Sequence, residues 1–233
     1  MKLAIFGATG GIGAELLRQA LALSHEVTVA VRNPARLGAG LNGTRVVTAD
    51  LELSEPRLLE SAVAGADAVL SGVGPRPMAK AGVAEHGTRA IIAAMQATGV
   101  RRIIVVSAAP ISTMPSPGRP HPPSHDPGEG FFMRNLGAPL FKTVLRERYT
   151  DLALMEDLLR ASDLDWTIFR PPRLTNGRLT GRYRTAMGRN LRGGNFISRA
   201  DVAHAMLAAL GRGETIRGEI GIAAGARARR RGR

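Results

Sequence analysis

The chain has 233 residues, of which 44% are hydrophobic and none is cysteine, and it carries 32 lysines and arginines against 19 acidic residues. This length suits one sizeable domain, and the missing cysteines exclude disulfides, thiolate catalysis and thiolate metal ligands. We expect a cytoplasmic protein, because no apolar run is long enough to span a membrane and the first residues predict a strand rather than a signal peptide.

The formal net charge is +13, and five of the positive charges are arginines in residues 227–233. Residues 225–233 lack apolar periodicity, so we expect a disordered arginine-rich tail after a domain formed by residues 1–224. A basic surface attracts anionic cofactors and substrates, and it can also bind nucleic acid loosely. Aromatic residues make up only 4% of the chain and no nucleic-acid-binding motif is visible. We therefore expect a small-molecule substrate rather than nucleic acid or a membrane as the partner.

The N-terminus predicts a strand over Leu3–Phe6 and a helix over Ile12–Leu23, joined by the turn Gly7-Ala8-Thr9-Gly10-Gly11-Ile12-Gly13. Glycine allows positive φ and a close approach of the backbone to a ligand. The free N–H groups at a helix start favour a pyrophosphate there. The strand–turn–helix context therefore predicts that Gly7, Gly10, Gly11 and Gly13 bind a dinucleotide. The alternative is a tight turn that holds no ligand.

The second strand is predicted over Glu26–Val31, and two arginines follow it, Arg32 and Arg36. A site for NAD usually has Asp or Glu at the end of this strand, to accept a hydrogen bond from the ribose 2′-hydroxyl. Arginines there suit a 2′-phosphate by charge and by their forked donors. NADP(H) is therefore favoured over NAD(H) as the cofactor. The alternative is that both arginines are only solvated.

The rest of the chain alternates between short apolar strands and helices. Further strands are predicted over Arg45–Thr48, Ala68–Ser71, Arg102–Ser107, Trp166–Arg170 and Glu219–Ala223. Further helices are predicted over Glu55–Ala62, Val83–Thr98, Tyr149–Ala161 and Ala200–Leu210, with Gly99 ending the second of these and Ser198 as the N-cap of the last. This alternation predicts a single α/β domain with a doubly wound parallel sheet of the Rossmann type.

A proline-rich stretch interrupts this alternation after the strand that ends at Ser107. Residues 110–130 contain seven prolines, which exclude a core helix or a central strand. We expect an insertion over about residues 110–148, which forms either a mobile lid over the substrate site or a disordered surface loop. His121 and His125 have a spacing that could bind a metal on a helix, but the surrounding prolines exclude that geometry, so we expect no metal site.

Several different short motifs lie between the glycine turn and the last predicted helix. They read Gly7-x-Thr9-Gly10-x-x-Gly13, Val31-Arg32-Asn33-Pro34-x-Arg36-Leu37, Ala49-Asp50, Val106-Ser107-Ala108, Arg170-Pro171-Pro172-Arg173-Leu174, Leu179-Thr180-Gly181-Arg182-Tyr183 and Ile197-Ser198-Arg199-Ala200-Asp201-Val202-Ala203. Over most of residues 1–222 the chain resembles the atypical short-chain dehydrogenase/reductase superfamily. Within it, the chain resembles the NmrA-like branch and its biliverdin-IXβ reductase/flavin reductase group. The insertion and the arginine tail lie outside this resemblance.

The resemblance implies a role for each matching position. Thr9, Gly10 and Ile12 would contact the cofactor phosphates, and Arg32 and Arg36 would hold the 2′-phosphate. Asp50 and Leu51 would border the adenine. Gly72, Val73 and Gly74 would lie on the ribose side. Ser107 would lie beside the nicotinamide, whose pocket Pro171 and Pro172 would line. Ser107 and Arg173 are the candidate catalytic residues, the first by orienting the carboxamide or the substrate and the second by pairing with an anionic substrate group. A structural ion pair is the alternative for Arg173.

The chain departs from the family at positions that carry chemistry. Conventional short-chain dehydrogenases use Tyr-x-x-x-Lys, but Ala153 lies four residues after Tyr149, the one tyrosine in the right region. The flavin-reductase group carries histidines where this chain has Leu152 and Arg173. Alcohol oxidation through a tyrosine–lysine pair is therefore not expected, and the roles of those histidines in tetrapyrrole binding do not transfer.

We expect an NADPH-dependent oxidoreductase that transfers hydride to a conjugated acceptor such as a flavin, a quinone or a tetrapyrrole. Such acceptors delocalise charge and need little acid catalysis, which fits a site without a strong general acid. The main alternative is a non-catalytic NADP(H)-binding sensor or regulatory protein of the NmrA-like type. A sugar-nucleotide epimerase or dehydratase is a third possibility, but it normally requires the missing tyrosine.

Overall fold

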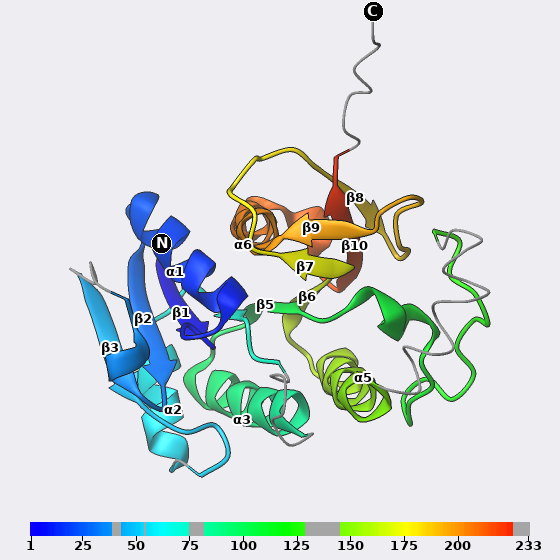
Figure 1. The fold of residues 1–233 in the computed structure, drawn as a ribbon. Coiled ribbons are helices and arrows are strands. Elements are labelled where there is room, and N and C mark those ends of the chain that lie inside the picture. The colour runs from blue at the N-terminus through cyan, green and yellow to red at the C-terminus, as the bar shows by residue number, and fades with distance from the viewer. Residues whose placement is uncertain (39–42, 54, 75–81, 129–144, 226–233) are drawn as a thin grey trace, which may run out of the picture.

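A central sheet with helices on both faces confirms the doubly wound α/β fold (Figure 1). The computed structural model describes residues 1–38, 43–53, 55–74, 82–128 and 145–225. The sheet runs in the order β3-β2-β1-β4-β5-β6-β10-β8, and its strands are β1 (Lys2–Phe6), β2 (Glu26–Val31), β3 (Thr44–Thr48), β4 (Ala68–Ser71), β5 (Arg102–Val106), β6 (Asp165–Arg170), β10 (Gly218–Ala224) and β8 (Tyr183–Met187). Every pairing is parallel except that of β8 with β10.

The helices form one layer on each face of the sheet. The first layer contains α1 (Gly11–Ala22) and α6 (Arg199–Ala208), and the second contains α2 (Pro56–Val63), α3 (Val83–Thr98) and α5 (Arg146–Ala161) (Figure 1). Successive side chains of each inner strand point to opposite faces of the sheet, and they contribute alternately to two apolar clusters, one under each helix layer. In β1, for example, Ala4 and Phe6 belong to the α2–α3–α5 side and Leu3 and Ile5 to the α1–α6 side. Burial on both faces explains why these strands are almost wholly apolar.

The predicted elements agree with the observed ones to within a few residues, and β2, β4 and α3 have the predicted bounds. Two predicted end signals are confirmed. Gly99 ends α3 with a φ of +73°, and the Ser198 hydroxyl caps α6 by accepting from the Asp201 N–H at 3.0 Å. Three strands were not predicted, namely β7 (Arg173–Thr175), β8 and β9 (Phe196–Ser198). They are short or polar, and β7 and β9 form a separate two-stranded sheet.

The described part of the predicted insertion is held against the rest of the protein. It begins with a 3₁₀ turn over Ala109–Thr113. The Asn190 amide donates to the Ala109 carbonyl at 3.0 Å and to the Ser112 hydroxyl at 3.2 Å. The buried Asp126 carboxylate accepts from the Asn190 and Gly128 N–H groups at 2.9 and 2.8 Å. Residues 129–144 of the insertion and the predicted tail after Gly225 lie outside the described residues.

The strand order contains the switch point that is typical of ligand-binding α/β sheets. The chain leaves β1 toward β2 and β3, and then crosses to β4 on the other side of β1. Ligands of open α/β sheets lie at such a switch point, outside the carboxyl ends of the strands. Both the glycine turn after β1 and Gly72 after β4 are at this edge. Among the described residues, no helix is long and apolar enough to cross a membrane.

Candidate functional site

The turn after β1 requires glycine for steric reasons. Gly7 has a φ of +75°, and a Cβ there would lie 2.8 Å from the Gly72 carbonyl carbon. A Cβ on Gly13 would lie only 2.1 Å from the Gly7 carbonyl oxygen. The backbones at the end of β1, the start of α1 and the end of β4 are therefore packed in direct contact. Close packing explains Gly7, Gly13 and Gly72 without reference to a ligand.

The start of α1 nevertheless retains the features of an anion site. Its N-cap is Gly10, which offers no side-chain hydrogen bond, and its first turn holds no acidic residue. The Gly10 N–H is occupied, because it donates to the Gly7 carbonyl at 2.8 Å. The helix dipole and the amides of the first turn are therefore not neutralised by a capping side chain. A phosphate group fits this place by charge and by hydrogen bonding.

Arg32 and Asp50 are brought together at the ends of β2 and β3. Their side chains form an exposed ion pair, with 3.7 Å between Arg32 Nη1 and Asp50 Oδ2. Asp50 also accepts from the Glu52 N–H at 3.0 Å. The Asn33 side chain accepts from the Ala35 N–H and so shapes the 3₁₀ turn that ends at the exposed Arg36. Exposed pairs of this kind contribute little free energy, so Arg32 can exchange its partner for a phosphate.

The residues predicted around the adenine and ribose converge on one side of α3. A Cβ on Gly87 of α3 would lie 3.1 Å from Leu51 Cδ1 and 3.3 Å from Val73 Cγ1. Leu51 and Val73 therefore both lie next to Gly87, a position of α3 that has no side chain. Gly72 and Gly74 flank the buried Val73 and remain half-exposed. The loops after β3 and β4 thus form one continuous surface beside the glycine turn.

Ser107 is buried, and its hydroxyl is committed to one partner. The hydroxyl donates to Glu156 Oε1 at 2.7 Å, while the Ser107 N–H donates to the Phe169 carbonyl. Glu156 also receives N–H groups from Arg170 and Arg160, which have no acceptor atoms, so both carboxylate oxygens act as acceptors. The single hydroxyl proton of Ser107 is therefore used, and its oxygen presents only lone pairs to a ligand.

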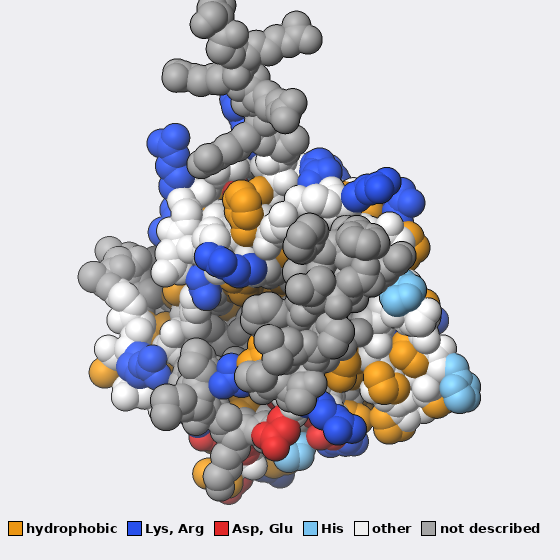
Figure 2. Space-filling view, turned by 45° about the vertical axis from the view of Figure 1, so that its right-hand side comes forward, with side chains coloured by type: hydrophobic (Ala, Val, Ile, Leu, Met, Phe, Trp, Pro, Cys, Tyr) orange, Lys and Arg blue, Asp and Glu red, His pale blue; other side chains and the backbone are white. Residues whose placement is uncertain are grey.

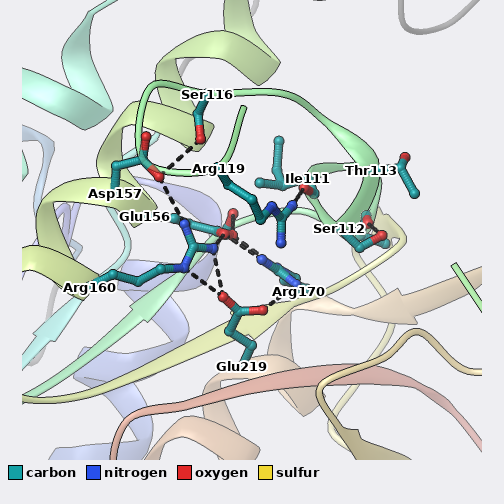
Figure 3. A network of polar contacts seen from close by, with 12 residues as sticks. Ile111, Ser112, Thr113, Ser116, Arg119, Glu156, Asp157, Arg160, Arg170 and Glu219 are labelled. Atoms are coloured by element: carbon teal, nitrogen blue, oxygen red, sulfur yellow. Dashed lines mark hydrogen bonds and ion pairs between the residues drawn. The ribbon is translucent and has the colours of Figure 1, made fainter. Parts of the chain in front are cut away.

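Glu156 lies at the centre of a buried ionic network that the sequence did not reveal (Figure 3). Glu156 is fully buried on α5, and Arg170 at the end of β6 is 3% exposed. Arg170 Nε donates to Glu156 Oε1 at 3.0 Å, and Arg170 Nη1 lies 2.7 Å from Glu219 Oε2 on β10. Arg160 completes the ring, since it bonds to both Glu156 and Glu219. The network thus fastens α5 to two neighbouring strands.

The charges of this network alter one another's pKa. Burial alone would raise the pKa of Glu219, but the positive charges of Arg170 and Arg160 hold it below its usual value. Burial alone would lower the pKa of Arg170, but Glu156 and Glu219 raise it. For Arg119, burial and then repulsion by Arg170 and Arg160 lower the pKa. The pairing of Arg170 with its carboxylate partners therefore favours the charged forms of Glu219 and Arg170.

The insertion reaches this network through its own residues. Asp157 on α5 accepts from the Ser116 hydroxyl at 2.9 Å and from the Gly118 N–H at 2.8 Å. Arg119 extends toward the ring and donates to the Ile111 carbonyl (Figure 3). The described part of the insertion therefore covers the carboxyl ends of β5 and β6, beside Ser107.

The remaining candidate residues are Pro171, which follows β6, Arg173, which begins β7, and Tyr149 on α5. Pro171 is buried, and its carbonyl accepts from the Ala109 N–H at 2.9 Å. Arg173 is exposed and forms no ion pair with any described residue, so the structural alternative receives no support from them. Tyr149 packs half-buried against the core, and burial raises its pKa. A raised pKa is the opposite of what a catalytic tyrosine needs, which agrees with Ala153, itself buried, in place of lysine.

Two signals in the sequence could have revealed the network. Glu156 shares its helix face with Leu152 and Leu159, which makes it a charged residue in an apolar stripe. Arg170 ends a strand in which the four residues before it, Trp166 to Phe169, are all buried. A charge in either setting requires a partner. Which partner it takes depends on the tertiary fold, and Glu219 is distant in the sequence.

The exposed surface reflects the overall charge. On the face shown in Figure 2, lysine and arginine side chains occur in several separate groups, whereas acidic side chains gather toward its lower part. Such an excess of positive charge favours anionic ligands. Among the described residues, no group of three or more potential ligands is placed to hold a metal ion.

The fold, the glycine turn at the switch point and the open start of α1 define a nucleotide-binding α/β protein. Comparison with known proteins specifies the class further, because residues 7–212 match the profile of the NAD(P)H-binding family. The chain belongs to this family.

Three similar proteins illustrate its range. The uncharacterized protein YwnB of Bacillus subtilis (strain 168) is 28% identical over 213 residues, which are 89% of this chain and 91% of that protein. A wide-type short-chain dehydrogenase/reductase of Veillonella parvula, solved in complex with NADP, is 21% identical with a TM-score of 0.75, and the match covers 95% and 94% of the two chains. The anaerobilin reductase ChuY of Escherichia coli O157:H7 is 22% identical with a TM-score of 0.70, over 95% and 97% of the two chains.

Proposed function

We propose that the protein is an NADPH-dependent reductase that transfers hydride to a conjugated acceptor, such as a flavin, a quinone or a tetrapyrrole. The observation that carries the proposal is the uncapped start of α1 at the switch point of an NAD(P)H-binding fold. Arg32 and Arg36 follow the neighbouring strand, where a 2′-phosphate would need positive charge. The Veillonella parvula structure with NADP supports this choice of cofactor.

The residues of the chain would position the reactants rather than supply a proton. When bound, the reduced nicotinamide supplies a hydride from its C4. Ser107, whose proton is held by Glu156, would accept a hydrogen bond from the carboxamide N–H₂ or from a donor on the acceptor molecule. Pro171 and Pro172 would line the pocket of the ring, and Arg173 would attract an anionic acceptor group. Orientation and exclusion of water would then carry most of the rate enhancement.

The choice of a conjugated acceptor follows from the missing acid. The Ser107 proton points to Glu156, and the pKa of Tyr149 is raised by burial. A conjugated system delocalises the charge that arrives with the hydride, so solvent can provide the proton afterwards. The fold shared with an anaerobilin reductase supports a tetrapyrrole among the candidates.

A non-catalytic NADP(H)-binding sensor is the second candidate. Ala153 and Leu152 are buried among apolar side chains at positions where catalytic or tetrapyrrole-binding residues occur in the resembled families. A protein that only binds the cofactor needs no residue there. The two candidates share the cofactor site and differ in turnover.

Cofactor choice is tested by calorimetric titration of the protein with NADPH and NADH. Charge-assisted hydrogen bonds to a phosphate contribute about 1.5–3 kcal/mol, roughly one to two decades of affinity. We expect NADPH to bind more tightly, and Arg32→Ala to reduce the difference. Arg45 is exposed and lies near the amino end of β3, away from the carboxyl ends of the strands, so Arg45→Ala is the matched control and should change neither affinity. Equal affinities in the unsubstituted protein would overturn the assignment of NADPH.

Turnover is tested by following NADPH oxidation with FMN, FAD, simple quinones and linear tetrapyrroles. A reductase should oxidise NADPH faster than the protein-free mixture with at least one acceptor. Ser107→Ala should then lower kcat more than it weakens NADPH binding, because the serine acts on the reacting groups. Tight NADPH binding without any acceptor-dependent oxidation would instead establish the sensor.

A further inference from the structure

Arg199, the first residue of α6, lies across the first turn of α1. A Cβ built on Gly11 would fall 2.5 Å from Arg199 Cδ and 2.6 Å from Arg199 Nε. The arginine side chain therefore rests directly on the Gly11 backbone, in space that a side chain at position 11 would fill. Glycine at this position is explained by Arg199 rather than by the turn, whose packing depends on Gly7, Gly13 and Gly72.

The charge of Arg199 is not neutralised by the described residues. Arg199 Nη1 donates to Asn176 Oδ1 at 2.6 Å, a neutral partner, and no described carboxylate lies within ion-pair distance. The nearby Asp201 carboxylate is engaged elsewhere, because it accepts from Thr180 and from the Gly181 N–H. A guanidinium with no acidic partner among the described residues, beside an uncapped helix start, is placed to bind an anion.

A buried contact fixes α6 relative to α1. The Gln19 amide, on α1, donates to the Ala200 carbonyl at 2.9 Å, and Gln19 is 5% exposed. The two helices also share the apolar cluster that contains Leu16 and Val202. The start of α6, from which Arg199 extends, is therefore held beside α1.

We propose that Arg199 is a further cofactor-binding residue, which closes over the pyrophosphate held at the start of α1. The proposal rests on the cofactor site of the proposed function but not on its acceptor chemistry. Arg199 and Arg32 would have separate roles. Arg199 would bind the pyrophosphate common to NADPH and NADH, whereas Arg32 would bind the 2′-phosphate that only NADPH carries. Loss of Arg199 should therefore weaken both cofactors equally and leave the preference between them unchanged.

The test compares Arg199→Met with Arg199→Lys by titration. Methionine keeps an apolar stem over Gly11 and removes the charge, whereas lysine restores the charge. Arg199→Met should weaken NADPH, NADH and ADP-ribose by a similar factor of about ten to one hundred, the range for a charge-assisted hydrogen bond. Binding of adenosine 2′-phosphate, which lacks the pyrophosphate, should not change. Arg199→Lys should recover part of the loss, and Arg45→Met should match the unsubstituted protein.

Other outcomes would separate this proposal from its alternatives. Unchanged affinity for NADPH and ADP-ribose in a folded Arg199→Met variant would overturn it. A loss shared by adenosine 2′-phosphate, together with a lower melting temperature of the free protein, would show a packing role and overturn it too. An unsubstituted protein that binds no dinucleotide would overturn both this proposal and the reductase. Failure of every acceptor would overturn the reductase alone, because these titrations do not depend on turnover.

Discussion

The region around the glycine turn and the region around Glu156 join neighbouring elements by opposite kinds of contact. Around β1, α1 and β4, backbone packs on backbone, and Gly7, Gly13 and Gly72 leave no space for a Cβ. Around β5, β6, α5 and β10, charged side chains fill the interior, and Glu156 is held by Ser107, Arg160 and Arg170 (Figure 3). We expect an added side-chain atom to destabilise the first region. We expect the loss of a charged side chain to destabilise the second.

This difference matches the tasks proposed for the two regions. A pyrophosphate needs exposed backbone N–H groups, which only a turn without side chains presents. The region proposed to lie beside the nicotinamide would instead need one hydroxyl in a fixed orientation, and the buried Glu156 carboxylate accepts the proton of Ser107. Substitutions should therefore damage the two regions in different ways, and the following predictions start from the largest expected effect.

Adding one methyl group to the glycine turn should have the largest effect. In Gly13→Ala the new Cβ would lie 2.1 Å from the Gly7 carbonyl oxygen, and backbone has to move to relieve the clash. We expect a loss of roughly 4 kcal/mol or more in the free energy of unfolding, or an insoluble protein. Urea denaturation measures the loss. Gly211→Ala, with no atom within 4 Å of the added Cβ, is the control and should stay near the unsubstituted value. Equal stability of the two variants would contradict steric closure of the turn.

Removing the central carboxylate should have the next largest effect. Glu156→Ala leaves Arg170 buried without its main partner, and breaking a buried ion pair in this way costs about 3–5 kcal/mol. Asp163→Asn removes one partner of the exposed Arg101–Asp163 pair and should cost no more than about 0.5 kcal/mol. Parallel denaturation curves of both variants give the comparison. A similar small cost for both would show that the buried network contributes no stability.

Acid should weaken the network region through Glu219. Its pKa is held low by Arg170 and Arg160 against the effect of burial, so folding favours the ionised form. The resulting stability is fully present above the ordinary glutamate pKa of 4.5 and is lost as the pH falls through the lowered value. We expect the stability difference between the unsubstituted protein and Glu219→Gln to shrink as the pH falls below 4.5. Denaturation midpoints measured from pH 7 down to pH 3 test this. A constant difference would exclude the linkage.

The smallest effect is expected at the exposed edge of the same region. Arg173 has no ion-pair partner among the described residues, so Arg173→Ala should change the free energy of unfolding by less than about 0.5 kcal/mol. If Arg173 attracts acceptors by charge, kcat/KM should fall severalfold for an anionic acceptor and stay constant for a neutral quinone. Steady-state kinetics with both acceptors provide the readout. Equal losses for the two would exclude a role through charge.

Local signals made most of the fold predictable. Alternating apolar runs and helix periodicity gave β2, β4 and α3 with the observed bounds, and Ser198 and Gly99 marked real helix ends. The strands β7 and β9 were not predicted, because each has only three residues and such a short segment shows no periodicity. The strand β8 reads Tyr-Arg-Thr-Ala-Met and lies at the sheet edge, so it lacks the apolar run of a buried strand.

The candidate site was predictable only where the chain itself brings residues together. The glycine turn and Arg32 follow their strands directly, and their roles stay predictions until the cofactor is titrated. Ser107 was predicted as a candidate, but its partner Glu156 was not, because Glu156 lies on α5, 49 positions later in the sequence. Arg199 was missed for the same reason, since only the packing of α6 on α1 places it over Gly11.

The hydrogen bond from Gln19 to Ala200 joins residues 181 positions apart. During synthesis the chain emerges from its N-terminus, so the glycine turn is made well before α6. Until then α1 lacks the packing that α6 supplies to their shared apolar cluster, and exposed apolar surface of this kind promotes aggregation. A product that stops before residue 199 would also lack the guanidinium proposed to hold the pyrophosphate. Bound dinucleotide should then stabilise, by mass action, chains that include α6 more than chains that stop before it.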